Sequence, residues 1–108
     1  MGRYISTTGT AGVVIRNANS NYNAQVNDRI ICNASGTFTI TLPAESTVQV
    51  NDTIQIVDAA GTFATYNVTV GRNGAKIQNL AEDCVLNINN TAITLVYTGT
   101  TYGWLIIR

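Results

Sequence analysis

The sequence predicts an all-β domain, an antiparallel β-sandwich or jelly-roll-like barrel of about nine short strands. Residues 37–42 (Thr-Phe-Thr-Ile-Thr-Leu) alternate hydroxyl and apolar side chains, which gives an extended strand one apolar face. Turn-forming Asn, Asp and Gly residues separate such runs at intervals of about 8 to 12 residues. No segment has the period of an amphipathic helix, so both the strands and their spacing favour an all-β fold.

The chain divides into an N-terminal arm over residues 1–12 and a single β-domain over residues 13–108. The arm contains Ser-Thr-Thr-Gly-Thr at residues 6–10 and has no core periodicity. Because it cannot bury itself, we expect it to lie against a neighbouring molecule wherever it is ordered. The remaining length suffices for one hydrophobic core.

The predicted strands follow one another from residue 13 to the C-terminus. Asn-rich residues 17–23 predict a turn, Asn73-Gly74 is a strong tight-turn signal, and residues 98–103 predict a hairpin loop. Residues 79–83 are expected to form a helical turn or a loop. We place the strands at 13–15, 29–32, 37–42, 53–58, 66–70, 75–78 (a short edge strand), 84–88, 92–97 and 104–107.

One short unit occurs twice. Gln-Val-Asn-Asp at residues 25–28 returns at residues 49–52, and each copy is followed by Gly-Thr-Phe, at residues 36–38 and 61–63. In each copy Asn-Asp indicates a turn that leads into an alternating strand. The unit is either a duplicated hairpin or one favourable turn used twice. Two copies are too few to indicate a solenoid or propeller, so we predict a sandwich with some internal symmetry.

Composition restricts the possible partners. Six basic residues balance six acidic ones, and only 11% of residues are charged, against roughly 25% in an ordinary globular chain. Low charge suits a surface covered by another protein, but it equally suits a merely polar β-protein. Zero net charge argues against binding to nucleic acid or an anionic membrane. We also expect neither a transmembrane helix nor a signal peptide.

The residues offer little catalytic chemistry. Histidine, the usual general base and commonest metal ligand, is absent from the sequence. Asp28 and Asp52 stay open as a facing carboxylate pair, but both occupy turn positions where Asp is a common structural choice. We therefore expect no enzyme, no metal and no cofactor.

Two other residue types have alternative interpretations. Cys32 and Cys84 lie in apolar runs, so they are expected to be buried free thiols, although a disulfide between them is possible. The aromatic residues Tyr4, Tyr22, Tyr102 and Trp104 could form a sugar-binding platform. Trp104 begins a terminal apolar strand and is more readily explained as core.

Residues 36–108 contain a set of motifs that resemble a known module. The matching segments are Phe38–Pro43, Val50–Asp58, Asn67–Gly74, Ala81–Asp83, Leu95–Gly99 and Gly103-Trp104. The combination resembles a structural module of bacteriophage virion proteins, particularly those of cyanophages and other marine phages. The module is found in small capsid decoration (cement) proteins and in tail fibres.

This resemblance implies a non-enzymatic virion protein. It indicates a capsid decoration protein on the capsid surface, a homotrimer that binds the major capsid protein and stabilises the head. The alternative is a tail-fibre or baseplate module that binds a host receptor or glycan. In either case the functional residues would form an interface, which we expect to include Tyr4, Ile5, Thr7, Thr8, Thr10, Tyr22 and Tyr102.

Overall fold

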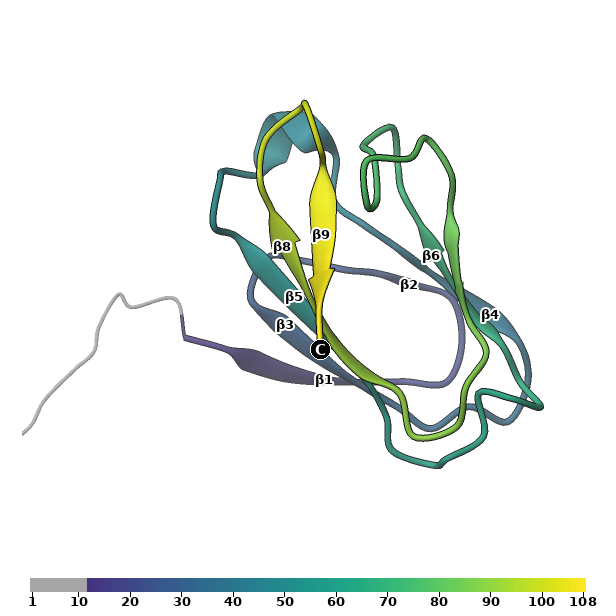
Figure 1. The fold of residues 1–108 in the computed structure, drawn as a ribbon. Coiled ribbons are helices and arrows are strands. Elements are labelled where there is room, and N and C mark those ends of the chain that lie inside the picture. Colours follow the sequence, from purple (N-terminus) through teal and green to yellow (C-terminus); the bar gives the residue numbers. More distant parts are fainter. Residues whose placement is uncertain (1–11) are drawn as a thin grey trace, which may run out of the picture.

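The computed structural model describes residues 12–108, in which nine strands form two sheets that face each other (Figure 1). The all-β prediction is therefore confirmed. The strands are β1 (Val14–Ala18), β2 (Tyr22–Asn23), β3 (Asp28–Cys32), β4 (Phe38–Thr41), β5 (Thr53–Asp58), β6 (Val68–Gly71), β7 (Cys84–Leu86), β8 (Ala92–Tyr97) and β9 (Trp104–Ile107), with one 3-10 turn, η2 (Glu45–Thr47), before β5.

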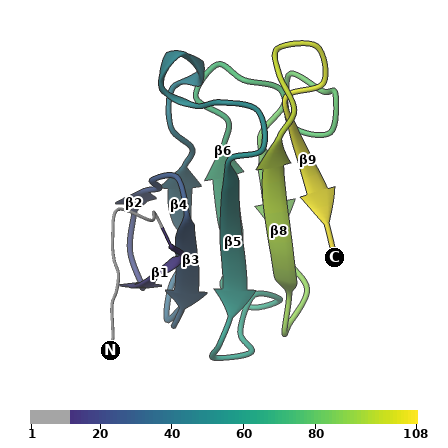
Figure 2. The ribbon, with the colours of Figure 1, turned by 90° about the vertical axis from the view of Figure 1, so that its left-hand side faces the viewer.

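The order of the strands shows that the chain coils. Sheet A has the order β1-β3-β5-β8-β9, and sheet B has the order β2-β4-β6-β7. The chain passes from sheet A to sheet B and back, so that β1 to β6 form three successive turns of a two-layered coil (Figure 2). The last three strands then add one antiparallel strand to sheet B and two to sheet A.

The expected antiparallel pairing was wrong for the coil. The pairs β1–β3, β2–β4, β3–β5 and β4–β6 are parallel. Parallel neighbours cannot be joined by a tight hairpin and need a crossover connection, and here each crossover contains a strand of the opposite sheet. Alternation along a strand determines which side chains face the core, but it does not determine the direction of the neighbouring strand.

The repeated Gln-Val-Asn-Asp unit forms the same turn before β3 and β5. The Asp28 N–H donates to the Gln25 carbonyl at 3.1 Å, and the Asp28 carboxylate accepts from the Gln25 N–H at 2.8 Å. The corresponding distances in the second copy, residues 49–52, are 3.0 and 2.7 Å. The third residue of each turn, Asn27 or Asn51, has a positive φ of 73° or 82°, as in a type II turn.

The Gly-Thr-Phe copies, in contrast, are not structurally equivalent. Phe38 begins β4, whereas Phe63 is fully buried in the loop between β5 and β6. β4 pairs through Phe38 with Val68 instead. The sequence repeat thus marks equivalent positions of the coil only at the starts of β3 and β5.

The core lies between the two sheets and is built from alternate residues of their strands. Trp104 is fully buried and packs edge-to-face against Tyr97, with ring centroids 5.2 Å apart and planes at 60°. Its predicted place in the core is confirmed. The largest fully buried apolar side chains are Trp104, Phe63, Ile30, Ile40, Leu42, Ile54, Ile56, Leu95, Val68 and Val70.

The other boundaries differ most from the predictions in three places, with smaller shifts at the strands predicted over 66–70 and 84–88, which are observed as Val68–Gly71 and Cys84–Leu86. β1 extends to Ala18, and β2 lies inside the Asn-rich segment predicted as a turn. The predicted edge strand at 75–78 is replaced by a tight turn in which Ile77 and Leu80 exchange backbone hydrogen bonds. Gln78 and Asn79 occupy its centre with φ of 54° and 63°, which is the conformation of a type I′ turn.

Candidate interaction surface

The side of sheet A that faces away from the core is unusually apolar. Strand alternation and pairing place one residue of every two on this side. Seven of these outward residues are aliphatic, and Arg29 is the one charged residue among them. The outer face, as we call it here, consists of Ile15, Asn17, Arg29, Ile31, Thr53, Gln55, Val57, Ala92, Thr94, Val96, Leu105 and Ile107.

The corresponding side of sheet B has a different character. Thr39, Thr41 and Thr69 point outward from β4 and β6, and Val85 lies opposite Thr69 on β7. Threonine hydroxyls are readily solvated, so this hydroxyl side suits contact with water. The contrast between the two sides makes the outer face of sheet A the better candidate for contact with another protein.

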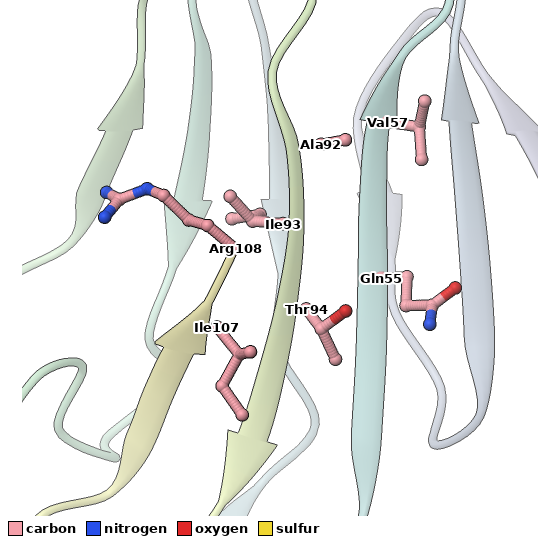
Figure 3. A pocket seen from close by; sticks show the side chains of 7 residues that line it. All are labelled: Gln55, Val57, Ala92, Ile93, Thr94, Ile107 and Arg108. Atoms are coloured by element: carbon pink, nitrogen blue, oxygen red, sulfur yellow. The ribbon is translucent and has the colours of Figure 1, made fainter.

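A shallow hollow marks the C-terminal part of the outer face (Figure 3). It has a volume of about 290 Å³ and is lined by residues of β5, β8 and the C-terminal end of β9, including Gln55, Thr94 and Ile107. On its β5 side the Arg29 guanidinium donates a hydrogen bond to the Gln55 side-chain oxygen. Arg29, the one charged side chain among the outward strand residues, is therefore already hydrogen-bonded to a neighbour, which lowers the cost of covering it. Arg108, which follows β9, adds a second charged residue to the lining of the hollow.

Sequence reasoning missed this face, although the sequence contains a signal for it. Adjacent aliphatic pairs interrupt the alternation in four strands: Ile30-Ile31, Ile56-Val57, Leu95-Val96 and Ile106-Ile107. In an extended strand the two members of such a pair point to opposite sides. Four pairs in one sheet therefore indicate that its outer side is apolar as well as its core side.

The predicted interface residues are not brought together. Tyr4, Ile5, Thr7, Thr8 and Thr10 lie outside the described residues. Tyr22 is half-buried on β2, whereas Tyr102 is 52% exposed in the β8–β9 hairpin. β2 and that hairpin lie at opposite ends of the molecule, so these two aromatic residues form no common platform (Figure 2).

Asp28 is the centre of a small polar cluster at the β1–β3 end. Its carboxylate is 2% exposed and accepts hydrogen bonds from the Tyr22 hydroxyl at 2.7 Å and the Gln25 N–H, and Arg16 Nε lies 3.5 Å from it. Burial, followed by the bond to Asp28 and its charge, raises the pKa of Tyr22 to about 12. Asp52 accepts a bond from the backbone of its own turn. Both carboxylates thus accept hydrogen bonds from the backbone of their own turns, as expected if Asp28 and Asp52 are turn residues.

Asp58 is the second buried carboxylate, and four backbone N–H groups surround it. Oδ1 accepts from Gly61 and Thr62 at 2.9 and 3.1 Å, and Oδ2 accepts from Phe63 and Asn90 at 3.1 and 2.9 Å. Burial alone would raise the pKa of Asp58, but these four bonds outweigh it and hold the pKa below its ordinary value. Asp58 therefore joins the loop after β5 to the turn before β8 and has no free lone pair directed at a ligand.

Both cysteines are free thiols, and no disulfide joins them. Cys32 is fully buried, as predicted, whereas Cys84 is only partly buried. Burial, with a smaller effect of the Asp58 charge, raises the pKa of Cys32 to about 12, and burial also raises the pKa of Cys84. Neither thiol has the lowered pKa of a reactive cysteine.

Residues 12–108 contain neither a metal-binding cluster nor a helix that could span a membrane. This part of the chain holds no group of three or more His, Cys, Asp or Glu side chains placed to bind a metal ion. Among the same residues, no helix has the length and hydrophobicity to cross a membrane.

The fold and this surface define an all-β protein with one apolar sheet face. No protein-family model matches the chain, and no curated protein matches it either.

Proposed function

We propose that this chain is a non-enzymatic structural protein of a bacteriophage virion, a capsid decoration protein that packs the outer face of sheet A against the major capsid protein. The main support for this binding surface is the composition of the outer face, which has seven aliphatic residues and one charged residue on a five-stranded sheet. The virion is suggested by the sequence resemblance of residues 36–108.

The size and chemistry of this face fit a protein partner. Five strands about 4.8 Å apart give a face roughly 20 Å wide, comparable to a substantial part of a protein–protein interface. The centre of such interfaces is depleted in charge and rich in apolar side chains. Near the middle of the face, Arg29 and Gln55 already share a hydrogen bond, so a partner needs to supply fewer hydrogen-bonding groups to these two side chains.

A matched pair of variants tests the surface. Val57→Glu places a carboxylate in the outer face, whereas Val85→Glu places one on the hydroxyl side of sheet B, where Val85 is 52% exposed. We expect Val57→Glu to abolish co-sedimentation with capsids and Val85→Glu to leave it unchanged. Unfolding curves of both variants should show that each is folded. Equal binding by both variants would refute the proposed surface.

The location in the particle needs a separate measurement. Immunogold labelling of purified virions with an antibody against this chain should place label over the head. Label on the tail or fibres would favour the alternative, a module for a host receptor or glycan, and would direct attention to exposed Tyr102. Virions without label would refute the virion proposal altogether.

A further inference from the structure

The two edges of sheet A differ in how they are covered. At β9, the backbone N–H of Trp104 donates to the Lys76 carbonyl at 2.8 Å, and the backbone carbonyl of Trp104 accepts from the Gln78 N–H at 2.8 Å. The Ile106 N–H donates to the side-chain oxygen of Gln78 at 2.9 Å. Residues 76–80, which contain the tight turn from Ile77 to Leu80, thus occupy the position of a further strand and block this edge.

At the opposite edge, no residue of the range 12–108 pairs with the outer side of β1. The Val14 N–H and the Ala18 carbonyl bond toward β3, at 2.9 and 3.0 Å. Because backbone groups alternate along a strand, those of Ile15 and Asn17 point away from β3. Val13, Val14 and Ile15 are exposed by 51, 41 and 61%, so this open edge is also apolar.

β1 lacks the features that usually protect an edge strand. It contains no proline and no lysine. Its one charged residue is Arg16, whose Nε lies 3.5 Å from the buried carboxylate of Asp28 and is thereby partly neutralised. An open, apolar and nearly uncharged edge is a template for another strand.

We propose that β1 pairs with β1 of a second copy of this chain, antiparallel and about a two-fold axis. A head-to-tail contact of β1 with β9 is blocked by residues 76–80. The described edges of sheet B, β2 and β7, have only two and three residues. The complementary edge is therefore β1 itself, and a two-fold contact of this kind closes on itself as a dimer.

The charge on β1 excludes one register, and the exposed apolar residues Val13 and Ile15 favour the register centred on Ile15 over one centred on Asn17. With Ile15 opposite the partner's Ile15, the two residues exchange both backbone hydrogen bonds, and Arg16 lies opposite the partner's Val14. A shift by one residue would place Arg16 opposite the partner's Arg16, and directly opposed like charges are destabilising. The favoured register also brings an exposed isoleucine from each copy together on the outer face.

The size of the contact predicts its strength. Five paired residues span roughly 17 Å, so the buried area falls below about 1,200 Å², the range of weak and transient interfaces. The dimer should therefore form at high protein concentration. Pairing would also join two outer faces into one ten-stranded surface, and binding through both faces at once would raise the avidity for a repeating partner lattice.

Trapping by cysteine tests the pairing in the full-length chain, without any capsid. In a Cys84→Ser background, Ile15→Cys should form an intermolecular disulfide on mild oxidation, because paired Cα atoms about 5.5 Å apart suit a disulfide. Ile107→Cys is the matched control, since Ile107 is 56% exposed on the same outer face but beside the blocked edge. We expect the dimer with Ile15→Cys and not with Ile107→Cys.

Sedimentation equilibrium gives an independent readout. The unmodified chain should show a monomer–dimer equilibrium that Ile15→Lys weakens by about tenfold or more, and that Ile107→Lys leaves unchanged. A chain that stays monomeric at millimolar concentration would overturn the proposal and leave β1 to another occupant, such as residues 1–11 or a strand of a different protein. A trimer, the assembly that the sequence resemblance implies, would overturn the dimer proposal, and so would equal cross-linking at both positions.

Discussion

The Asp58 carboxylate is expected to be among the most important polar groups for stability. It is 3% exposed, and each of its oxygens accepts two backbone hydrogen bonds. Asp58→Asn keeps the shape of the side chain but replaces one acceptor oxygen with a donor NH₂ group. Two buried backbone N–H groups then lose their acceptor and face another donor.

The cost follows from these contacts. An unpaired buried donor costs about 1 to 3 kcal/mol, and the two remaining bonds lose the benefit of a charged acceptor. We therefore expect Asp58→Asn to lower the free energy of unfolding by about 3 to 5 kcal/mol. The fluorescence of Trp104, the only tryptophan, should report the change in a urea titration because this residue is fully buried.

Asp52→Asn provides the control, since Asp52 accepts one backbone hydrogen bond, at 2.7 Å, in the corresponding turn of the repeat. Its loss should cost no more than about 1 kcal/mol. The reasoning would be refuted if Asp58→Asn and Asp52→Asn lowered the free energy of unfolding by the same small amount.

The effect of Asp58 should also depend on pH. Its folded pKa lies below its unfolded value, so the charged form stabilises the fold fully above the unfolded pKa of about 3.9. This stabilisation is lost as the pH falls through the folded pKa. The difference in unfolding free energy between the natural chain and Asp58→Asn should therefore be constant near neutrality and shrink in acid. A difference that grew on acidification would contradict the sign of the shift.

Two further predictions concern a glycine and the cysteines. Gly103→Ala should be strongly destabilising, because Gly103 has a φ of 73° and the new Cβ would collide with the Lys76 backbone carbonyl. Gly74→Ala is the control, since its new Cβ meets no atom and should cost only about 1 kcal/mol. Equal thermal unfolding of the two variants would contradict this. In the native protein at pH 8, Cys84 should react with a thiol reagent well before Cys32, whose pKa is raised to about 12 by burial and the Asp58 charge. Simultaneous modification of both thiols below the unfolding transition would argue against the buried position of Cys32.

Much of the local structure could be predicted because it depends on local patterns. The alternation in residues 53–58 and 92–97 and the apolar run at 104–107 gave the limits of β5, β8 and β9 as the structure has them. Asn73-Gly74 forms the expected tight turn, with the Ala75 N–H bonded to the Arg72 carbonyl and φ of 51° and 89° at its centre. In each case the residues that set the conformation are neighbours in sequence.

The partners of the strands could not be predicted in the same way. Three parallel neighbours, β1, β3 and β5, are separated by strands of the other sheet, so their pairing depends on how the chain coils in space. The repeated turn at 25–28 and 49–52 was recognised but not interpreted as a coil. The two copies are 24 residues apart, which is too long for a hairpin but suits one circuit of the chain through both sheets. Residues that pair between β3 and β5, such as Arg29 and Gln55, are instead 26 residues apart. That difference obscured the relationship.

The candidate surface was missed for a related reason. A search for alternating strands treats every second residue as solvent-facing and does not examine its type. Ile31 and Val57 occupy such positions and lie beside each other on neighbouring strands, although 26 residues separate them in the sequence. The threonines of β4 and β6 occupy the same kind of position in sheet B. Comparing the outward residues of the two sheets, rather than the core-facing ones, distinguishes a face that water can cover from one that another protein is better able to cover.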